Sequence, residues 1–137
     1  MKTAIIYYTL SGKTRLWAEK AAQSLSADLF EVKEYKPKNF LTSFLIGCPQ
    51  ARRQKSTPLA TPDIDLTDYK RIILAAPVWA GYPAPAFNSI INMLPANKEI
   101  EIALTSSSGK SSCREKVNLQ IEDKNCHIKD WLDIKTK

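Results

Sequence analysis

The sequence has few of the residues that metal centres and disulfide frameworks require. Its 137 residues include one histidine, His127, and three cysteines, Cys48, Cys113 and Cys126. The cysteines are odd in number and none belongs to a C-x-x-C pair, so we expect free thiols in a cytoplasmic protein. A single histidine is too few for a metal cluster. We therefore expect no metal site, and we expect His127 to be a surface residue rather than a catalytic base.

Long apolar runs and a leader are also lacking. No apolar stretch reaches the length of a membrane span, and a strand-like run begins directly after the N-terminus, which predicts neither membrane association nor a signal peptide. Hydrophobic residues make up 44% of the chain and charged residues 25%, which is ordinary for a soluble globular protein. The length predicts a single domain over residues 1–137.

Three phosphate-handling motifs are absent or incomplete. The letters SGKT at residues 11–14 match the end of the P-loop motif G-x-x-x-x-G-K-[ST], but Tyr7 stands where that motif needs its first glycine. The dinucleotide motif G-x-G-x-x-G is missing. A cysteine phosphatase needs a thiolate in its anion-binding loop, and the loop after the first apolar run has no cysteine. These absences argue against a triphosphate-binding protein, an NAD-binding domain and a cysteine phosphatase.

The net charge is +6, which favours anionic ligands or partners. The densest basic group, residues 52–55, is short, and the basic residues do not gather on one predicted helix. We therefore expect no nucleic-acid partner.

Apolar patterning predicts five strands separated by helical segments. The strands are expected at residues 2–9, 27–33, 71–76, 99–105 and 126–134. In the last of these, one face carries Cys126, Ile128, Leu132 and Ile134. Strands that alternate with helices predict an α/β fold with a doubly wound, five-stranded parallel sheet.

The helices between these strands are predicted from apolar residues at helical spacing. They are expected at residues 13–25, 86–94 and 111–124. The second places Phe87, Ile90, Ile91 and Leu94 inward. The third also fits a strand, and we choose a helix because a crossover is needed before the last strand. A further helix over residues 39–54 is expected to be interrupted at Gly47 and Pro49.

Glycine is scarce, with four in the chain, and three of them lie in the same place relative to a predicted strand. Gly12, Gly81 and Gly109 each follow a predicted strand, namely the first, third and fourth. In an open α/β sheet, ligands bind outside the carboxyl ends of the strands, and in the strand order 2-1-3-4-5 these three loops meet at one crevice. Glycines that only mark turns are the alternative. All three glycines are expected at the same edge of the sheet, which favours a binding site over three unrelated turns.

The first of these loops offers hydroxyl groups and a helix N-terminus. Thr9, Ser11 and Thr14 lie within six residues around Gly12. Aligned amides and the helix dipole at such a loop bind a phosphate. Ser11 as a simple helix N-cap is the alternative, although a cap needs only one hydroxyl.

The other two loops fit a planar ring. Trp79 and Tyr82 in the second loop can stack on such a ring or merely pack under a proline-rich turn. Residues 105–109 in the third loop supply hydroxyls and free amides to a ring edge. A phosphate site, an aromatic platform and a polar rim together predict a mononucleotide with a planar heterocycle.

Two of these loops resemble those of the flavodoxin-like family. The stretch TLSGKT is similar to its phosphate loop T-x-[ST]-G-x-[ST], matched by Thr9, Ser11, Gly12 and Thr14. The stretch PVWAGYPAP is similar to its second flavin loop, and the resemblance runs from Met1 to about Gly109. It implies a flavodoxin-like three-layer sandwich that binds FMN without a covalent link.

The resemblance also implies a set of cofactor-binding residues and a function. FMN would lie against Thr9, Leu10, Ser11, Gly12, Lys13, Thr14, Pro77, Val78, Trp79, Ala80, Gly81, Tyr82, Ser106, Ser107, Ser108 and Gly109. Trp79 would be the main stacking residue, Gly81 would let the backbone adjust on reduction, and no side chain would act as an acid or base. The protein would be an electron carrier or a small reductase, with a redox partner protein or a quinone-like acceptor.

Two departures from the family bear on partners. The family's electron shuttles are typically acidic, whereas this chain is basic, and the chain stops after the fifth predicted strand, where the family has a final helix. A bare sheet face would expose apolar surface, so we expect a homodimer or another protein to cover it. A shortened gene is the rival explanation. The alternative function is a flavin-free scaffold that acts through protein contacts.

Overall fold

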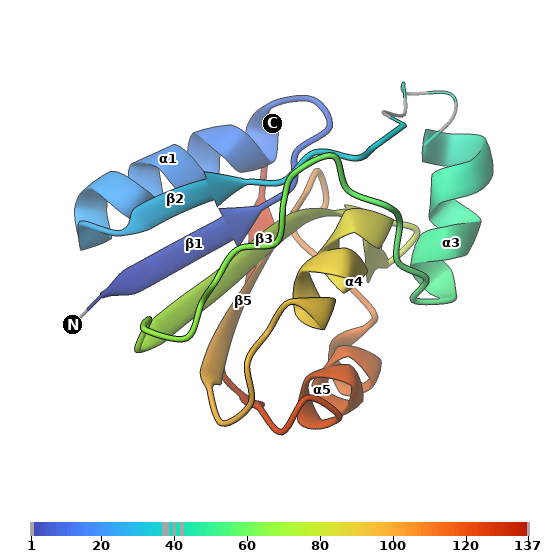
Figure 1. The fold of residues 1–137 in the computed structure, drawn as a ribbon. Coiled ribbons are helices and arrows are strands. Elements are labelled where there is room, and N and C mark those ends of the chain that lie inside the picture. The colour runs from blue at the N-terminus through green and yellow to red at the C-terminus, as the bar shows by residue number, and fades with distance from the viewer. Residues whose placement is uncertain (1, 37–38, 40, 42, 137) are drawn as a thin grey trace.

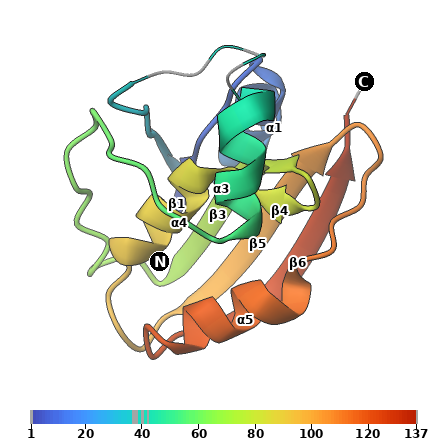
Figure 2. The same cartoon turned by 90° about the vertical axis from the view of Figure 1, so that its right-hand side faces the viewer.

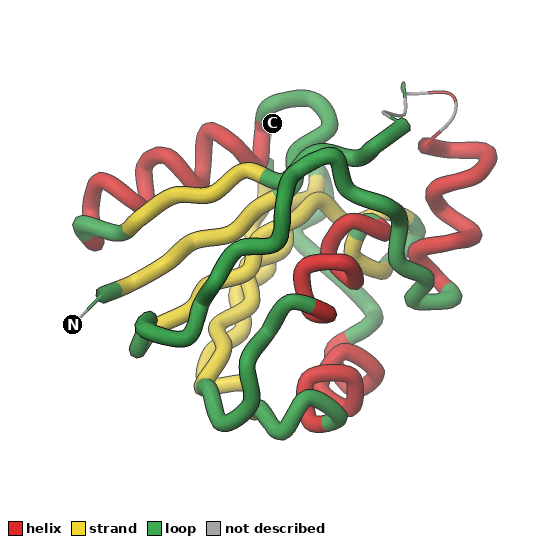
Figure 3. Tube along the Cα trace, viewed as in Figure 1, coloured by secondary structure: helices red, strands yellow, loops and turns green. Residues whose placement is uncertain are grey.

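A computed structural model of the chain describes residues 2–36, 39, 41 and 43–136. Strands and helices alternate along it, as Figure 3 shows. In chain order the elements are β1 (Thr3–Tyr7), α1 (Lys13–Leu25), β2 (Asp28–Glu31), the π-helix η1 (Ser43–Gly47), α3 (Cys48–Arg52), β3 (Arg71–Trp79), β4 (Tyr82–Pro83), α4 (Pro85–Asn92), β5 (Glu99–Ser106), α5 (Arg114–Glu122) and β6 (His127–Lys135). The helix chosen for residues 111–124 is α5.

The five longer strands form one parallel sheet in the order β2-β1-β3-β5-β6 (Figure 1). The sixth strand, β4, has two residues and pairs antiparallel with the end of β3. Counted over the parallel strands alone, this is the predicted order 2-1-3-4-5. The strand order reverses between β1 and β3, so the chain leaves these neighbouring strands in opposite directions and opens a crevice at their carboxyl ends.

Helices cover both faces of the sheet, which gives the predicted three-layer sandwich. Figures 1 and 2 show α1 on one face, with α3, α4 and α5 on the other. Alternate residues of the central strands serve the two layers: Ile6 and Leu74 pack on the side of α4, and Ile5 and Ile73 pack on the side of α1. No helix within the described ranges is long and apolar enough to cross a lipid bilayer.

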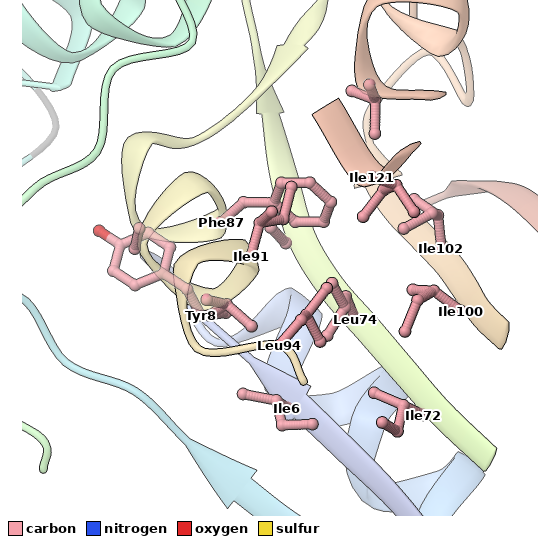
Figure 4. Packing of buried hydrophobic residues seen from close by; sticks show 14 of the residues in the cluster. Ile6, Tyr8, Ile72, Leu74, Phe87, Ile91, Leu94, Ile100, Ile102 and Ile121 are labelled. Atoms are coloured by element: carbon pink, nitrogen blue, oxygen red, sulfur yellow. The ribbon is translucent and has the colours of Figure 1, made fainter. Parts of the chain in front are cut away.

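The larger core lies between the sheet and α4 (Figure 4). The four side chains predicted to point inward from α4 and its C-terminal end are all buried: Phe87, Ile90, Ile91 and Leu94. They meet Leu74 of β3 and Ile102 of β5 in the same cluster. The continuous apolar runs of β1, β3 and β5 are therefore explained by burial on both faces.

The predicted face of the last strand is wrong beyond Ile128. β6 contains a β-bulge: Ile100 pairs with Ile128, but Glu101 pairs with Asp130, so Lys129 is an extra residue. An extra residue moves every following side chain to the other face. Cys126 and Ile128 therefore belong to the α4 side, whereas Leu132 lies on the α1 side and is 53% exposed.

The predicted interruptions at Gly47 and Pro49 are also wrong. Residues 43–47 form a π-turn that runs directly into α3, and Gly47 has helical dihedral angles. Pro49 lies at the start of α3, directly after the change from π-helix to α-helix. Part of the predicted helix, residues 40 and 42, lies outside the described residues.

The α1 side of the sheet is covered by α1 over β1 and β3, and its far part is largely polar. There Arg71 and Glu101 form a two-pronged ion pair, with Nη2 donating to Oε1 at 2.8 Å. Asp130 and the half-exposed Leu132 of β6 lie on the same face. A homodimer is expected because a bare sheet face would expose apolar surface. Among the described residues, the exposed apolar surface on this face is mainly Leu132, and the dimer stays a prediction.

Two tyrosine hydroxyls anchor β2, the edge strand beside β1. Tyr7 donates to Glu31 and Tyr69 donates to Asp28, both at 2.6 Å. Arg15 binds the Glu31 carboxylate at 2.9 and 3.0 Å and lowers its pKa. Burial and the bond to Glu31 raise the pKa of Tyr7 to about 12, and the bond to Asp28 raises the pKa of Tyr69 to about 12. The fold therefore favours both protonated phenols.

We predict that the free energy of unfolding falls as the pH rises from 10 to about 12. The Tyr7 contribution is complete below the unfolded pKa of 10.0 and is lost as the pH passes the folded value. Tyr7→Phe removes a hydrogen bond to a carboxylate, so it should cost about 1–2 kcal/mol at neutral pH and make the alkaline decline shallower. Urea unfolding followed by circular dichroism across this range measures both effects. Tyr35→Phe is the control, because that side chain is 68% exposed, and equal declines in the two variants would contradict the assignment.

Candidate functional site

The loops after β1, β3 and β5 lie together at the carboxyl edge of the sheet. The Thr14 and Thr105 hydroxyls are 2.7 Å apart, which joins the first turn of α1 to the end of β5. The Ser112 N–H donates to the Gly81 carbonyl at 3.0 Å, which joins the second and third loops. The fold therefore brings the three glycine-containing loops to one place.

The first loop presents the N-terminus of α1 without a side-chain cap. Gly12 is the N-cap residue, its φ is +96°, and no side-chain hydrogen bond caps the helix. Ser11 is exposed, so the alternative in which Ser11 caps the helix is wrong. The Thr9 hydroxyl instead accepts the Gly12 N–H at 3.0 Å. Amide groups and a helix dipole at such a terminus attract an anion.

The other residues predicted in this loop have different surroundings. Thr14 is buried, and its hydroxyl is bonded to Thr105 beneath the loop. Lys13 is exposed, whereas Leu10 is half-buried against the main core. A hollow beside the loop is lined by Thr9 and the Arg15–Glu31 ion pair, among others. The exposed polar groups of the loop are therefore Ser11, Lys13 and the partly exposed Thr9.

The second loop is shorter than the predicted one, because β3 continues to Trp79. Trp79 pairs with Tyr82 across a two-residue turn, Ala80-Gly81. Both turn residues have positive φ, +55° and +87°, as a type I′ hairpin turn requires. Ala80 is exposed at the tip in a conformation that residues with a β-carbon rarely adopt.

The stacking role predicted for Trp79 does not fit this geometry. Its side chain is 8% exposed and packs into the main core, where its ring meets Tyr8 edge-on with centroids 5.9 Å apart. The hairpin folds the ring inward, so its face is not offered to the loops. Tyr82 is half-buried, and the Lys116 ammonium lies 5.6 Å from its ring centroid.

The third loop closes on its own first serine. The Ser106 hydroxyl accepts the N–H groups of Gly109 and Lys110 at 2.9 and 3.2 Å. Gly109 has a φ of +72°, and a β-carbon there would lie 2.9 Å from the Lys135 β-carbon. Ser107 and Ser108 are exposed. The loop therefore packs on the end of β6 and presents its serines outward.

A pocket lies between the second and third loops. Its lining comprises Val78, Ala80 and Gly81 with residues 106–108 and 110–112. Pro77 is paired with Thr105 inside the sheet and is not part of the lining. Sequence reasoning missed Lys110, Ser111 and Ser112, although the serine run continues past Gly109 in the sequence.

A second hollow adjoins the same turn at Ala80. It is lined by Cys48, Pro49, Arg52, Arg53 and Ala80, so Ala80 borders both hollows. By sequence reasoning, residues 52–55 are only a short basic group. The signal that could have revealed this site is the absence of any acidic residue from 35 to 62.

Comparison with known proteins supports the family already suggested by the loops. No protein-family model and no curated protein sequence matches the chain. A flavoprotein from Lactobacillus acidophilus, solved in complex with FMN, matches its structure with a TM-score of 0.76 and 25% identity, covering 95% of this chain and 91% of that chain. Flavodoxin 1 from Bacillus cereus matches with a TM-score of 0.60 and 12% identity, covering 100% and 87%.

The strand order, the three loops and these likenesses define a doubly wound α/β protein with a site at the carboxyl edge of its sheet. The chain has a flavodoxin-like fold.

We predict that the turn glycine contributes to stability in two separable ways. An alanine β-carbon at position 81 would lie 2.3 Å from the Ser112 hydroxyl oxygen, and its φ would stay at +87°. Gly81→Ala should therefore cost the ~1 kcal/mol of a left-handed alanine plus the smaller cost of turning the Ser112 hydroxyl away from the new methyl group. Adding Ser112→Ala should recover the steric part only, because the serine β-carbon is 3.6 Å away.

Gly12→Ala is the matched control for this cycle. Its φ is +96°, but nothing lies within 4 Å of an added β-carbon, so only the backbone cost of about 1 kcal/mol is expected. Urea unfolding of Gly81→Ala, Ser112→Ala, their double variant and Gly12→Ala gives the two costs. Equal destabilisation by Gly81→Ala with and without Ser112→Ala would contradict the close approach of the two loops.

Proposed function

We propose that this chain binds FMN at the three loops and works as a redox flavoprotein, either an electron carrier or a small reductase. The observation that carries this proposal is the uncapped N-terminus of α1 beside a pocket lined by serines and the Ala80-Gly81 turn. The FMN complex of the similar Lactobacillus acidophilus flavoprotein supports it.

The residues of the first loop fit a phosphate group. Ser11 is exposed next to Gly12, whose left-handed backbone leaves the amides of the first helical turn without a side-chain acceptor. Hydroxyl donors and backbone amides at a helix N-terminus bind a dianion with a favourable dipole. Lys13 adds a positive charge at the same end of the helix. Ser11 and the helix amides would hold the phosphate.

The pocket between the second and third loops fits the edge of a flavin ring. Val78 and Ala80 supply apolar wall, and the serines from Ser106 onward supply hydroxyl and amide groups for the heteroatoms of a pyrimidine edge. Because Trp79 is buried, the flavin ring would contact the backbone and the small side chains of the turn instead. When bound, FMN supplies the electron-transfer chemistry, while these residues bind and orient it.

No side chain in the site needs to act as a catalyst in this proposal. The nearby thiol of Cys113 is buried, and burial raises its pKa to about 11, so it stays protonated at neutral pH. A redox partner protein or a quinone-like acceptor would exchange electrons with the bound flavin.

Ser11→Glu is predicted to abolish FMN binding without unfolding the protein. The carboxylate would occupy the phosphate position, and a negative charge at a helix N-terminus is favourable for the fold by about 0.5 kcal/mol. Flavin fluorescence titration should show at least a hundredfold weaker dissociation constant, and the yellow colour should be lost on desalting.

Ser24→Glu is the matched control, because it adds the same charge to an exposed position at the opposite end of α1. It should bind FMN as the unmodified protein does. Unchanged affinity in Ser11→Glu would refute this placement of the phosphate. If the unmodified protein retains no FMN at tens of micromolar, the flavin-free scaffold becomes the better function.

A further inference from the structure

The hollow beside α3 combines an apolar floor with two unpaired cations. Cys48, Pro49 and Ala80 give it apolar walls, and Arg52 and Arg53 supply its charge. Both arginines are exposed in the last turn of α3 and just after it. Neither guanidinium forms an ion pair or a hydrogen bond with another side chain of the described residues.

No acidic residue lies near these arginines in the sequence. Residues 35–62 contain no aspartate or glutamate and five basic residues, Lys36, Lys38, Arg52, Arg53 and Lys55. Burial raises the pKa of the Cys48 thiol, so that group stays neutral and does not repel an anion. Arginine also binds carboxylate and sulfonate groups through two parallel hydrogen bonds. The chemistry of the hollow therefore fits a small aromatic acid.

The position of the hollow relates it to the proposed flavin. Ala80 lines both this hollow and the serine-lined pocket, so the two adjoin at one turn. A molecule held by Arg52 or Arg53 would lie one turn away from a ring bound in the second pocket. Electron exchange needs such proximity, whereas structural support of the fold would require neither the hollow nor the exposed charges.

We propose that this hollow, lined by Cys48, Pro49, Arg52, Arg53 and Ala80, binds an anionic quinone-like electron acceptor beside the flavin. The arginines bind its anionic oxygen and the apolar walls contact its ring. Bound FMN would supply the two electrons and two protons that reduce such an acceptor to a hydroquinone, and it would itself be oxidised. This inference rests on the proposed FMN function.

The test compares an anionic acceptor with an uncharged one. The anionic probe is 2,6-dichlorophenolindophenol, and the uncharged probe is duroquinone, whose blocked ring positions prevent addition to cysteine. FMN-loaded protein is photoreduced without oxygen, and its reoxidation by each acceptor is followed by stopped-flow absorption. In Arg52→Gln/Arg53→Gln the rate constant with the anionic dye should fall at least tenfold, while the rate with duroquinone and the FMN dissociation constant should change less than twofold.

Lys20→Gln/Lys129→Gln is the matched control. It removes the same charge from exposed positions on α1 and β6, away from the hollow. An equal loss of rate in both double variants would overturn the site, because the effect would then be one of net charge. Slower reaction with both acceptors, together with weaker FMN binding, would also overturn it and assign the arginines to the flavin site.

Equilibrium dialysis of the dye against the flavin-free protein separates this inference from the proposed function. Binding that depends on Arg52 and Arg53 but not on Lys20 and Lys129 supports the hollow as an anion site, even if FMN fails to bind. Binding that persists unchanged in Arg52→Gln/Arg53→Gln overturns it, whatever the outcome of the FMN titration.

Discussion

A hydrogen bond between two buried hydroxyls, those of Thr14 and Thr105, lies beneath the whole candidate site. Thr14 is in the first turn of α1, and Thr105 is near the end of β5, across the crevice opened by the reversal of strand order. The bond therefore fixes the start of α1 against the strand that presents the serine loop. Among the described contacts, no other hydrogen bond between buried side chains joins the first turn of α1 to the end of β5.

The Ala80-Gly81 turn is the second constraint, and it separates two hollows of different chemistry. Serines line one hollow and arginines line the other. The turn is held in place by the N–H of Ser112 and by the close approach of Gly81 to the Ser112 side chain. Small residues at the turn keep the wall between the hollows thin, since Ala80 has only a methyl group and Gly81 has no side chain.

The positions of the strands and loops could be predicted, because they follow from patterns within single segments, whereas the strand order was the one that the family resemblance implies. The apolar runs of β1, β3 and β5 reflect burial on both faces, and each glycine follows its strand. Errors arose where one residue changes the outcome. The bulge at Lys129 turned Leu132 to the other face, and a two-residue turn drew Trp79 into the core. Neither event leaves a local pattern, since each depends on how a neighbouring strand pairs.

The conformation of Ala80 links stability to function. A left-handed alanine costs about 1 kcal/mol or more, and asparagine or glycine would fill the first position of a type I′ turn at lower cost. Folding alone therefore gives no reason for alanine here. Backbone strain is typical of ligand-binding sites, where the ligand rather than the fold decides which residue is present. Ala80 is strained and borders two hollows. In the two proposed sites, a glycine would add backbone freedom between the flavin and the acceptor, and an asparagine would place a polar group where both sites have apolar wall. Alanine meets both demands, and the large core between the sheet and α4 supplies the stability that offsets its strain.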